Sequence, residues 1–443
     1  MNIMVNIRPF SGYRYNEKKL DISKVVLPPY ELANEEFKEN FLKMSPFNVI
    51  NIYLGKSGSE AKDPNCKRYA HSAEMFRKWI RDGYLLKDEG PCLYVYSQEF
   101  ELGGRKMERT GFVSLVELEK LGKNIFPHEE TLQDTLVNRR LLIEKTRANF
   151  GLIFSLYSDP QKRIEILLES AKQKPPVSEF FTGYEGVRHR LWIMRDKTTI
   201  NKIADAMRNK KLLIADGHHR YKICLGYSKA NPDDEKARYT SMMLVNAHND
   251  GLAILPTHRL VKGIRNFSKE KLIERMGLYF AMEAFDFKTK DEDTRIKELM
   301  QRLGARDGRH FGMYLGEEKY HILRLKDEKA MEQEAKEFSR QWRRFDMNII
   351  HVLILKKILG VDTMKACDQC HMEYVKDFHD NAKRCISKVR SGECQVAFFA
   401  NPAKVEQVKE ISENGEMIPP KSTCFYPKVY CGVVIHRFDD ALG

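Results

Sequence analysis

The chain has 443 residues, enough for two or three domains, and apolar residues make up 42% of it, enough for real hydrophobic cores. No signal peptide and no apolar run close to the roughly 20 residues of a membrane-spanning helix is visible, so we expect no membrane association. The nine cysteines have irregular spacings that do not resemble a disulfide framework, which predicts a reducing, cytoplasmic location.

The formal net charge of +13 is spread along the chain. Segments such as "KEKLIERMGLYF" and "KDEKAMEQEAKEFSRQWRRFD" mix basic with acidic residues, and no polybasic tail occurs. Mixed charges of this kind indicate solvated helix faces rather than a nucleic-acid surface. We therefore expect no nucleic-acid partner, while a small anionic substrate stays compatible with the charge.

Helical and strand-like patterns alternate from the N-terminal part onward. In the first part of the chain they predict a helix at 30–44, a strand at 47–55, a helix at 70–86 and a β-hairpin at 92–118. The hairpin should turn at Gly103 and Gly104. Together these elements indicate a mixed α/β fold.

The alternation continues to the C-terminal part. The patterns predict a strand at 189–196, a helix at 198–209, a strand at 211–215, a helix at 220–230, a strand pair within 239–261, helices and a strand within 266–345, a helix at 347–360, a strand at 394–401 and a last strand at 430–438. No repeat of 20 to 50 residues is visible.

The stretch "LLIADGHHRY" places a polar cluster at a strand-to-helix turn. Asp216 can cap the helix, and Gly217 lets the backbone approach a ligand. The N–H groups of the helix start, the helix dipole and Arg220 would then face an anion, which favours phosphate. Adjacent His218 and His219 diverge by about 100° on a helix, which disfavours a shared metal. A capped helix with two ordinary histidines is the alternative.

A second polar cluster lies in "PHEETL". His128 and Glu129 follow Pro127, and Thr131 is placed to enter a helix that runs to Arg147. The Glu129 carboxylate could act as a general base or could cap the helix, and the residues by themselves favour the cap.

Two more segments carry donors that suit an oxyanion. The donors are His258 and Arg259 in "PTHRL" and Lys421, Ser422, Thr423 and Lys428 in "PPKSTCFYPK". The second segment is bounded by prolines and combines lysines with hydroxyls. A solvated surface loop is an equal alternative.

Cys367, Cys370 and His371 form the C-x-x-C-H pattern of covalent haem attachment. That attachment belongs to exported proteins, and a zinc site would need further ligands. A surface connection with incidental cysteines is the favoured interpretation. The chain also has no phosphate-binding P-loop, no dinucleotide fingerprint, no H-E-x-x-H and no G-x-S-x-G, which argues against standard nucleotide folds and hydrolases.

Segments along nearly the whole chain resemble domain of unknown function family 1015. They include "IRPFSGYRYN", "SPFNVINI", "PHEETL", "TRANFGLIFSLY", "IADGHHRY", "LVNAHNDGLAILPTHRL" and "NPAKVEQVKEISENGEMIPPKSTCFYPKVYCGVVI". The "ADGHHRY" element resembles a turn of ParB-like and sulfiredoxin-like folds, whose members include free L-serine kinases. Lys222 stands where the family usually has an acidic residue, which we expect to change the helix surface more than the chemistry.

The resemblance implies a mixed α/β protein with a ParB/sulfiredoxin-like core. The implied segments are 1–90, an N-terminal α/β segment; 91–265, the ParB-like core with the DGHHR turn; 266–345, an α/β subdomain; and 346–443, a C-terminal α/β segment. The implied activity is phosphorylation of L-serine to O-phospho-L-serine with diphosphate as donor and Mg²⁺ as cofactor, by a cytoplasmic monomer or homodimer.

The resemblance also implies roles for the polar residues. Glu129 is the first choice for the base, Asp216 is the competing base or Mg²⁺ ligand, and His218 or His219 would stabilise the transferred group. Substrate and phosphate would be bound by Gly217, Arg220, His128, Thr131, Arg147, His258, Arg259, Lys421, Ser422, Thr423 and Lys428. The rivals are a serine kinase that uses ATP or ADP and a non-catalytic ParB-like protein that binds nucleotide or DNA.

Overall fold

A computed structural model describes residues 4–29, 35–54, 64–130, 136–183, 185–288, 291–306, 309–376 and 381–438. The chain has a mixed α/β architecture, as the sequence predicts, and it divides into two compact units. Unit 1 comprises residues 1–127, 133–252 and 427–443, and unit 2 comprises 128–132 and 253–426. The ParB-like detail and the four sequence-defined segments stay predictions.

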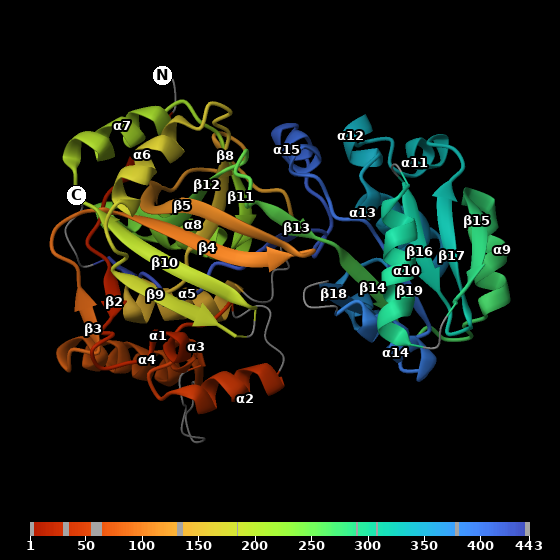
Figure 1. Ribbon diagram of the computed structural model, residues 1–443, viewed down its shortest axis with the longest axis horizontal. Helices are drawn as coiled ribbons and strands as arrows, with labels where there is room; N and C mark the ends of the chain where they lie inside the picture. The colour runs from red at the N-terminus through yellow and green to blue at the C-terminus, as the bar shows by residue number, and fades with distance from the viewer. Residues whose placement is uncertain are drawn as a thin grey trace. The chain divides into compact units, whose positions relative to one another are not determined.

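A large mixed sheet forms the centre of unit 1. Its strands are β1 (Ile7–Arg8), β4 (Leu93–Leu102), β5 (Arg105–Glu117), β6 (Ile125–Phe126), β8 (Ile153–Tyr157), β9 (Ser178–Thr182), β10 (Val187–Met194), β11 (Leu212–Asp216) and β12 (Tyr239–Asn246). They follow the order β6-β11-β8-β12-β5-β4-β10-β9, with β1 beside β5 (Figure 1). β11 runs parallel to β6 and antiparallel to β8.

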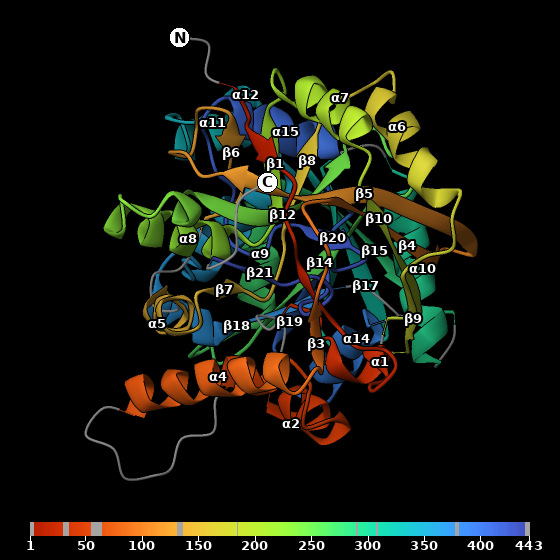
Figure 2. The same ribbon diagram turned by 90° about the vertical axis from the view of Figure 1, so that its left-hand side faces the viewer.

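Short strands and helices complete unit 1. The paired short strands are β2 (Tyr13–Tyr15) with β3 (Leu85–Lys87), and β7 (Ala148–Asn149) with β21 (His436–Arg437). The helices are α1 (Ile22–Val25), α2 (Glu35–Met44), α3 (Ile50–Leu54), α4 (Pro64–Arg81), α5 (Leu136–Thr146), α6 (Arg163–Lys172), α7 (Lys197–Met207), α8 (His218–Ala230) and the 3₁₀ turn η3 (Glu235–Arg238). Figure 2 shows α6 and α7 together and α8 near α5.

The core of unit 1 follows the apolar periodicity of these elements. Helix α7 begins at Asp196, whose carboxylate accepts a hydrogen bond from the Thr199 N–H at 2.7 Å. Its buried Ile200, Ile203 and Met207 repeat at helical spacing and join the sheet's apolar cluster. The predicted helices and strands between residues 70 and 118 and between 189 and 230 are confirmed, including the hairpin turn, except that the helix predicted at 70–86 ends at Arg81 and residues 85 and 86 belong to β3.

The strand predicted at 47–55 is wrong, because helix α3 forms there. The reason is Asn48, which is fully buried and whose side chain organises the turn. Its oxygen accepts the Ile50 N–H at 3.0 Å, and its amide donates to the carbonyls of Lys24 and Val26. These hydrogen bonds therefore stabilise a capped helical turn, although the alternating apolar pattern of the same residues predicts a strand.

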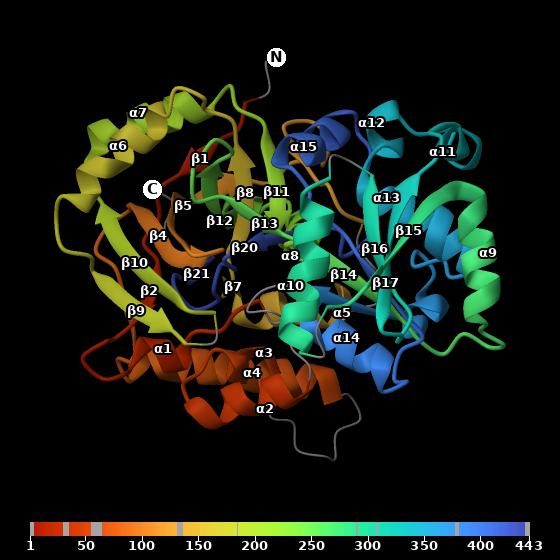
Figure 3. The same cartoon turned by 45° about the vertical axis from the view of Figure 1, so that its right-hand side comes forward.

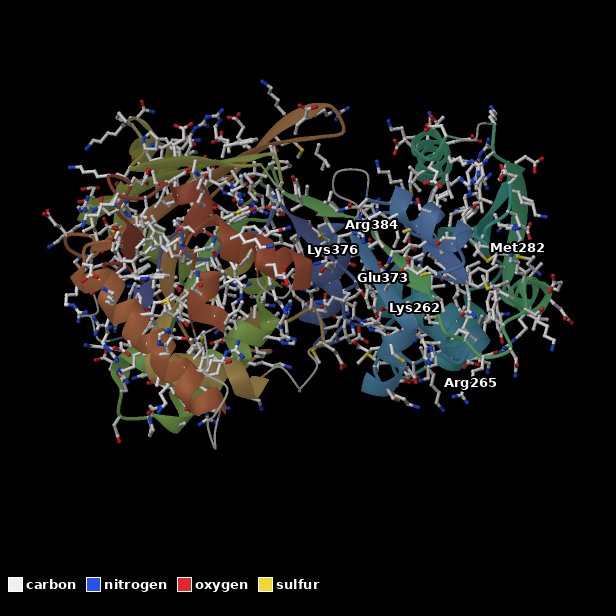
Figure 4. The ribbon with its side chains drawn as sticks, turned by 90° about the horizontal axis from the view of Figure 1, so that it is seen from below. Lys262, Arg265, Met282, Glu373, Lys376 and Arg384 are labelled. Carbon is white, nitrogen blue, oxygen red and sulfur yellow. The ribbon has the colours of Figure 1, made fainter. Side chains whose placement is uncertain are left out.

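Unit 2 is built on a second sheet. Its strands are β14 (Thr257–Val261), β15 (Phe280–Asp286), β16 (His310–Tyr314), β17 (Lys319–Leu325), β18 (Met372–Lys376) and β19 (Val396–Phe399), in the order β15-β17-β16-β19-β14-β18. Figure 4 labels Glu373 and Lys376 on the edge strand β18 and Met282 on the opposite edge strand β15. A separate pair joins β13 (Ala253–Leu255) to β20 (Cys424–Tyr426).

Helices cover the second sheet (Figure 3). They are α9 (Lys269–Tyr279), α10 (Glu292–Gly304), α11 (Lys329–Glu334), α12 (Arg340–Arg343), α13 (Asp346–Ile349), the π-helix η4 (Ile350–Leu359), the 3₁₀ turn η5 (Ala366–His371), α14 (Lys383–Arg390) and α15 (Val405–Glu413). Buried Leu299 and Leu303 of α10 pack with Ile386 and Val389 of α14 in one apolar cluster. No helix in the described ranges combines the length and apolar character that crossing a bilayer would require.

Two predictions near the C-terminal end are confirmed only in part. The apolar run at 347–360 is helical, but it passes from α13 into the wider π-helix η4. The strand predicted at 430–438 is reduced to β21, and the residues before it contribute only single bridges at Cys431 and Ile435. The predicted strand at 394–401 is confirmed as β19.

Candidate functional site

The "ADGHHRY" stretch forms the predicted strand-to-helix turn in unit 1. Strand β11 ends at Asp216 after a register shift against β8. Gly217 has a φ of 92°, in the left-handed region that glycine adopts without strain, and α8 begins at His218. The side chain of His218 is buried and that of His219 is partly buried. Asp216 and Gly217 therefore sit at the N-terminal end of a helix of 13 residues.

Asp216 is held between two cations. One carboxylate oxygen lies 3.1 Å from Lys428 Nζ, and the other lies 2.8 Å from the Arg220 guanidinium. The Lys428 side chain is 6% exposed and that of Arg220 is 12% exposed. Charge-assisted contacts of this kind are stronger than neutral hydrogen bonds, and burial reduces their screening. Asp216 therefore orients a lysine and an arginine at one helix start.

This arrangement suits an anion. The N–H groups of the first turn of a helix have no acceptor within the helix, and the helix dipole is positive there. Lys428 and Arg220, both held by Asp216, place two cationic side chains at the helix start. A phosphate oxygen meets both donors and positive charge in such a place. We name Asp216, Gly217, Arg220 and Lys428 the DGHHR-turn site.

Gly217 also gives Arg220 the space it occupies. A Cβ added at Gly217 would lie 3.0 Å from Arg220 Nε, closer than side chains normally approach. The Arg220 guanidinium donates in addition to the Leu152 carbonyl. A side chain at position 217 would therefore strain the backbone angle and crowd the arginine.

Two buried residues that the sequence did not single out hold Lys428 in place. Gln98 of β4 and Arg109 of β5 lie opposite each other in the sheet, and both are fully buried. The Gln98 amide donates to the Lys428 carbonyl at 2.8 Å, and Arg109 donates to the Pro427 carbonyl at 2.5 Å. Arg109 also donates to the Gln98 side-chain oxygen. Nothing in the local sequence signals these contacts, because they join segments far apart in the chain.

Unit 2 brings together a second group of the predicted residues. The His128 ring nitrogen Nε2 lies 2.7 Å from the Thr423 hydroxyl, and both side chains are buried. Glu129 forms a parallel bridge with Ile418. Lys421 has a φ of 62°, which is unusual for a residue with a side chain. The "PHEETL" segment and the "PPKST" loop are therefore neighbours within this unit.

Arg259 is the buried cation of the same group. Burial lowers the pKa of Arg259 to about 10, and the Coulombic effects of Tyr374 and Glu129 oppose that shift. The Arg259 guanidinium donates to the Lys421 carbonyl at 3.3 Å. Arg259 and the loop that carries Lys421 are thus in direct contact, while the charge of Glu129 acts on Arg259.

The remaining predicted residues have other surroundings. His258 is fully buried in β14, where its ring nitrogen Nδ1 accepts the Ala400 N–H at 3.4 Å. Ser422 is buried as well. Arg147 binds Tyr227 and Asp234, which places its guanidinium at the far end of α8 from Asp216. Thr131 lies outside the described residues. The structure thus brings Arg220 and Lys428 to Asp216, but not Arg147.

The contacts of Asp216 do not suit a magnesium ligand. Both of its oxygens already bind cations, whereas Mg²⁺ requires oxygen ligands in near-octahedral geometry. Within the part of the chain that the structure describes, no group of three or more His, Cys, Asp or Glu could hold a metal ion. We assign Mg²⁺ no role at this turn.

The C-x-x-C-H side chains are engaged separately. The Cys370 thiol lies 3.1 Å from the Cys367 carbonyl, and His371 Nδ1 lies 3.0 Å from the carbonyl of Lys262. Both thiols are exposed. These contacts belong to the short turn η5 that precedes β18 and do not converge on one point.

A small cavity in unit 1 borders the DGHHR-turn site. It has a volume of about 40 Å³ and is lined by Arg220, Asn149, Cys224 and Cys431, among others. A space of this size holds a few water molecules. It is too small for an amino acid, so it is not a substrate pocket as it stands.

A family model described as "Protein of unknown function (DUF1015)" matches residues 7–348. The chain belongs to this family. The DUF1015 match covers the DGHHR turn, the "PHEETL" segment and β14, and it ends before the "PPKST" loop and Lys428. No curated protein matches the chain significantly.

Solved structures give distant likenesses to this DUF1015 protein. A conserved hypothetical protein from Pyrococcus furiosus is 14% identical, with 74% of this chain and 96% of that chain covered and a TM-score of 0.35. A free serine kinase in complex with AMP is 14% identical, with coverages of 71% and 93% and a TM-score of 0.33. SbnI with a C-terminal truncation, from Staphylococcus aureus, is 12% identical, with coverages of 72% and 86% and a TM-score of 0.32. Such low scores do not establish a shared fold or activity.

Proposed function

We propose that this protein transfers a phosphoryl group from diphosphate to the hydroxyl of L-serine, giving O-phospho-L-serine and phosphate. The observation that carries the proposal is the DGHHR-turn site, where Lys428 and Arg220 flank the start of α8. The resemblance of the sequence to family 1015 supplies the reaction, and the geometry of this turn suits the anionic donor.

In this proposal the DGHHR-turn site binds a phosphate of the donor. Phosphoryl transfer depends mainly on positioning and on cations that stabilise the transferred group. Lys428 and Arg220 would supply the cations, and the first N–H groups of α8 would supply neutral donors. Asp216 would keep these two side chains in place through its contacts with both. It is not proposed as the base, because a carboxylate engaged by two cations is a poor proton acceptor.

The proton of the serine hydroxyl needs a separate acceptor. Glu129 is the proposed base, and this residue of unit 2 is only partly buried. His218 and His219, at the first turn of α8, are proposed to stabilise the transferred group. Among the unit 2 residues, His128, Arg259, Lys421, Ser422 and Thr423 stay proposed contacts of the substrate.

The proposal is tested by incubating the purified full-length chain with L-serine, Mg²⁺ and diphosphate, ADP or ATP in separate reactions. Phosphorus NMR and mass spectrometry would detect O-phosphoserine. We expect product with diphosphate, and loss of product in Asp216→Asn and Glu129→Gln variants that keep the wild-type melting temperature. Formation of O-phosphoserine with ATP or ADP but not with diphosphate would show that the donor is a nucleotide. The absence of O-phosphoserine with all three donors would refute the proposed kinase activity.

A further inference from the structure

A second, larger cavity lies entirely within unit 2. Its volume is about 550 Å³, and it is lined from α11, α12, η4 and the segments around Glu130 and Ile418. Figure 3 shows α11 and α12 near each other in this unit. Ligand pockets have volumes of roughly 300–1,000 Å³, so this space is large enough for a small organic molecule. Nothing in the proposed serine phosphorylation uses it.

One wall of this cavity is apolar. Val352, Ile418 and Trp342 are buried and line it. Phe338 stacks on Trp342 with ring centroids 3.9 Å apart and planes 12° apart, and its ring is partly exposed. Such a surface gains free energy by contact with a hydrocarbon chain, and an aromatic face also attracts a cation.

The charged lining carries an excess of carboxylates. Lys357 pairs with Glu334 at 2.8 Å, and Lys356 pairs with Asp362 at 3.6 Å, so each lining lysine has its own acidic partner. His351, also in the lining, is held neutral because burial lowers its pKa to about 4. The lining contains two more carboxylates, those of Glu130 and Glu337.

No ion pair within 4 Å joins Glu130 or Glu337 to any other residue of the described ranges. Among the described residues, the cavity therefore presents two carboxylates without a direct ion-pair partner beside an apolar wall. An anionic ligand would be repelled, and a purely apolar one would leave both carboxylates partly desolvated without a partner. A ligand with two positive charges on a hydrocarbon chain matches both features.

We propose that this cavity binds a linear diamine or polyamine, whose ammonium groups pair with Glu130 and Glu337 and whose methylene chain packs against the apolar wall. Binding forms and breaks no covalent bond, and it does not depend on the proposed kinase activity. The two lysine–carboxylate pairs remain as they are and keep the remaining charges balanced.

The test is calorimetric titration of the full chain with spermidine. We expect one saturable site with a dissociation constant on the order of micromolar. Glu337→Gln and Glu130→Gln should each weaken binding by about tenfold, because each removes one charge-assisted contact. Glu332→Gln is the matched control, since Glu332 is an exposed carboxylate on the same helix as Glu334 but outside the lining of this cavity.

Several outcomes would overturn the proposal. They are no saturable binding of spermidine, equal weakening by Glu332→Gln, equal binding of 1,8-octanediol, and displacement of spermidine by stoichiometric MgCl₂. Val352→Phe should fill the cavity and abolish binding. If that variant does not fold, Glu337→Gln still decides the question, because Glu337 is exposed and its substitution does not disturb a core.

Discussion

Lys428 is the residue at which the DGHHR-turn site can be tested most directly. Lys428→Met keeps an unbranched side chain, one heavy atom shorter, and removes its charge from beside Asp216. We expect kcat/KM for diphosphate to fall by about a hundredfold, because a preorganised cation is lost from the anion site. Steady-state kinetics with varied diphosphate measures this.

The matched control for this prediction is Lys229→Met. Lys229 is an exposed lysine in the last turn of α8, at the other end of the helix from Asp216. An unchanged kcat/KM for diphosphate in Lys428→Met, or an equal loss in Lys229→Met, would remove Lys428 from the anion site.

His436 makes the stability of unit 1 depend on pH. It is buried beside Phe10 and Phe438, and burial lowers its pKa to about 3 from an ordinary value of 6.5. Below pH 6.5 the unfolded chain binds a proton at this position and the folded chain does not, so protonation favours unfolding. The free energy of unfolding therefore falls as the pH drops from 6.5 towards 3, by about 1.4 kcal/mol per pH unit for this residue.

His436→Phe should remove that contribution. We expect the free energy of unfolding of the variant to depend less on pH between about 6 and 4, by about 1.4 kcal/mol per unit, as measured by urea unfolding at a series of pH values. His248→Gln is the control for the loss of an exposed imidazole. Identical pH profiles for wild type and His436→Phe would contradict the prediction.

At the scale of elements, the paired strands β4 and β5 act as the support of Lys428. The Gln98 and Arg109 side chains hold the carbonyls of Lys428 and Pro427. Gln98→Met removes the donor to Lys428 and should loosen the segment that presents its ammonium group. We expect kcat/KM for diphosphate to fall by about tenfold. We also expect faster chemical acylation of Lys428, which mass spectrometry would measure.

Ser97→Ala is the control on the same strand. The Ser97 hydroxyl is buried and has no hydrogen-bond partner among the described residues, so its removal should leave activity and labelling unchanged. Unchanged labelling of Lys428 in Gln98→Met would show that these strands do not position it.

The elements that the sequence predicted correctly are those whose signals are local. Helix α7 has a capping aspartate and a regular apolar stripe, and the β4–β5 hairpin has its turn glycines. Helix α3 was missed because its cause, buried Asn48, acts through carbonyls of another segment. The π-helical part of the run after Ile349 was missed because apolar periodicity does not distinguish closely related helix types.

At the scale of the molecule, the chain path separates what the sequence places together. The chain passes from unit 2 back into unit 1 at residue 427. Lys428 therefore belongs to unit 1, whereas the "PPKST" loop with which the sequence grouped it belongs to unit 2. It meets Asp216 across a separation of 212 residues. The DGHHR turn itself was predictable from its spacing and residue types. Lys428 was predictable as a phosphate contact, but the sequence did not indicate that it lies beside Asp216.

The absence of a nucleic-acid partner, which the mixed charges of the sequence predict, stays a prediction. Figure 4 labels four basic residues of unit 2, Lys262, Arg265, Lys376 and Arg384, and one acidic residue, Glu373, which pairs with Lys388 at 2.7 Å. Basic side chains interleaved with acidic ones create a weak field at the distance of a DNA backbone. The net charge of +13 therefore should not translate into tight binding.

We accordingly predict that fluorescence anisotropy with a labelled duplex of about 30 base pairs detects at most weak binding, lost when NaCl rises to about 200 mM. The physical reason is that non-specific attraction to DNA depends on the release of counterions and weakens with salt. A sequence-specific DNA-binding protein keeps part of its affinity through contacts with the bases in the grooves. Heparin should compete with any residual signal. A submicromolar dissociation constant that persists at the higher salt concentration would favour a ParB-like DNA-binding protein over an enzyme that acts on a small anion.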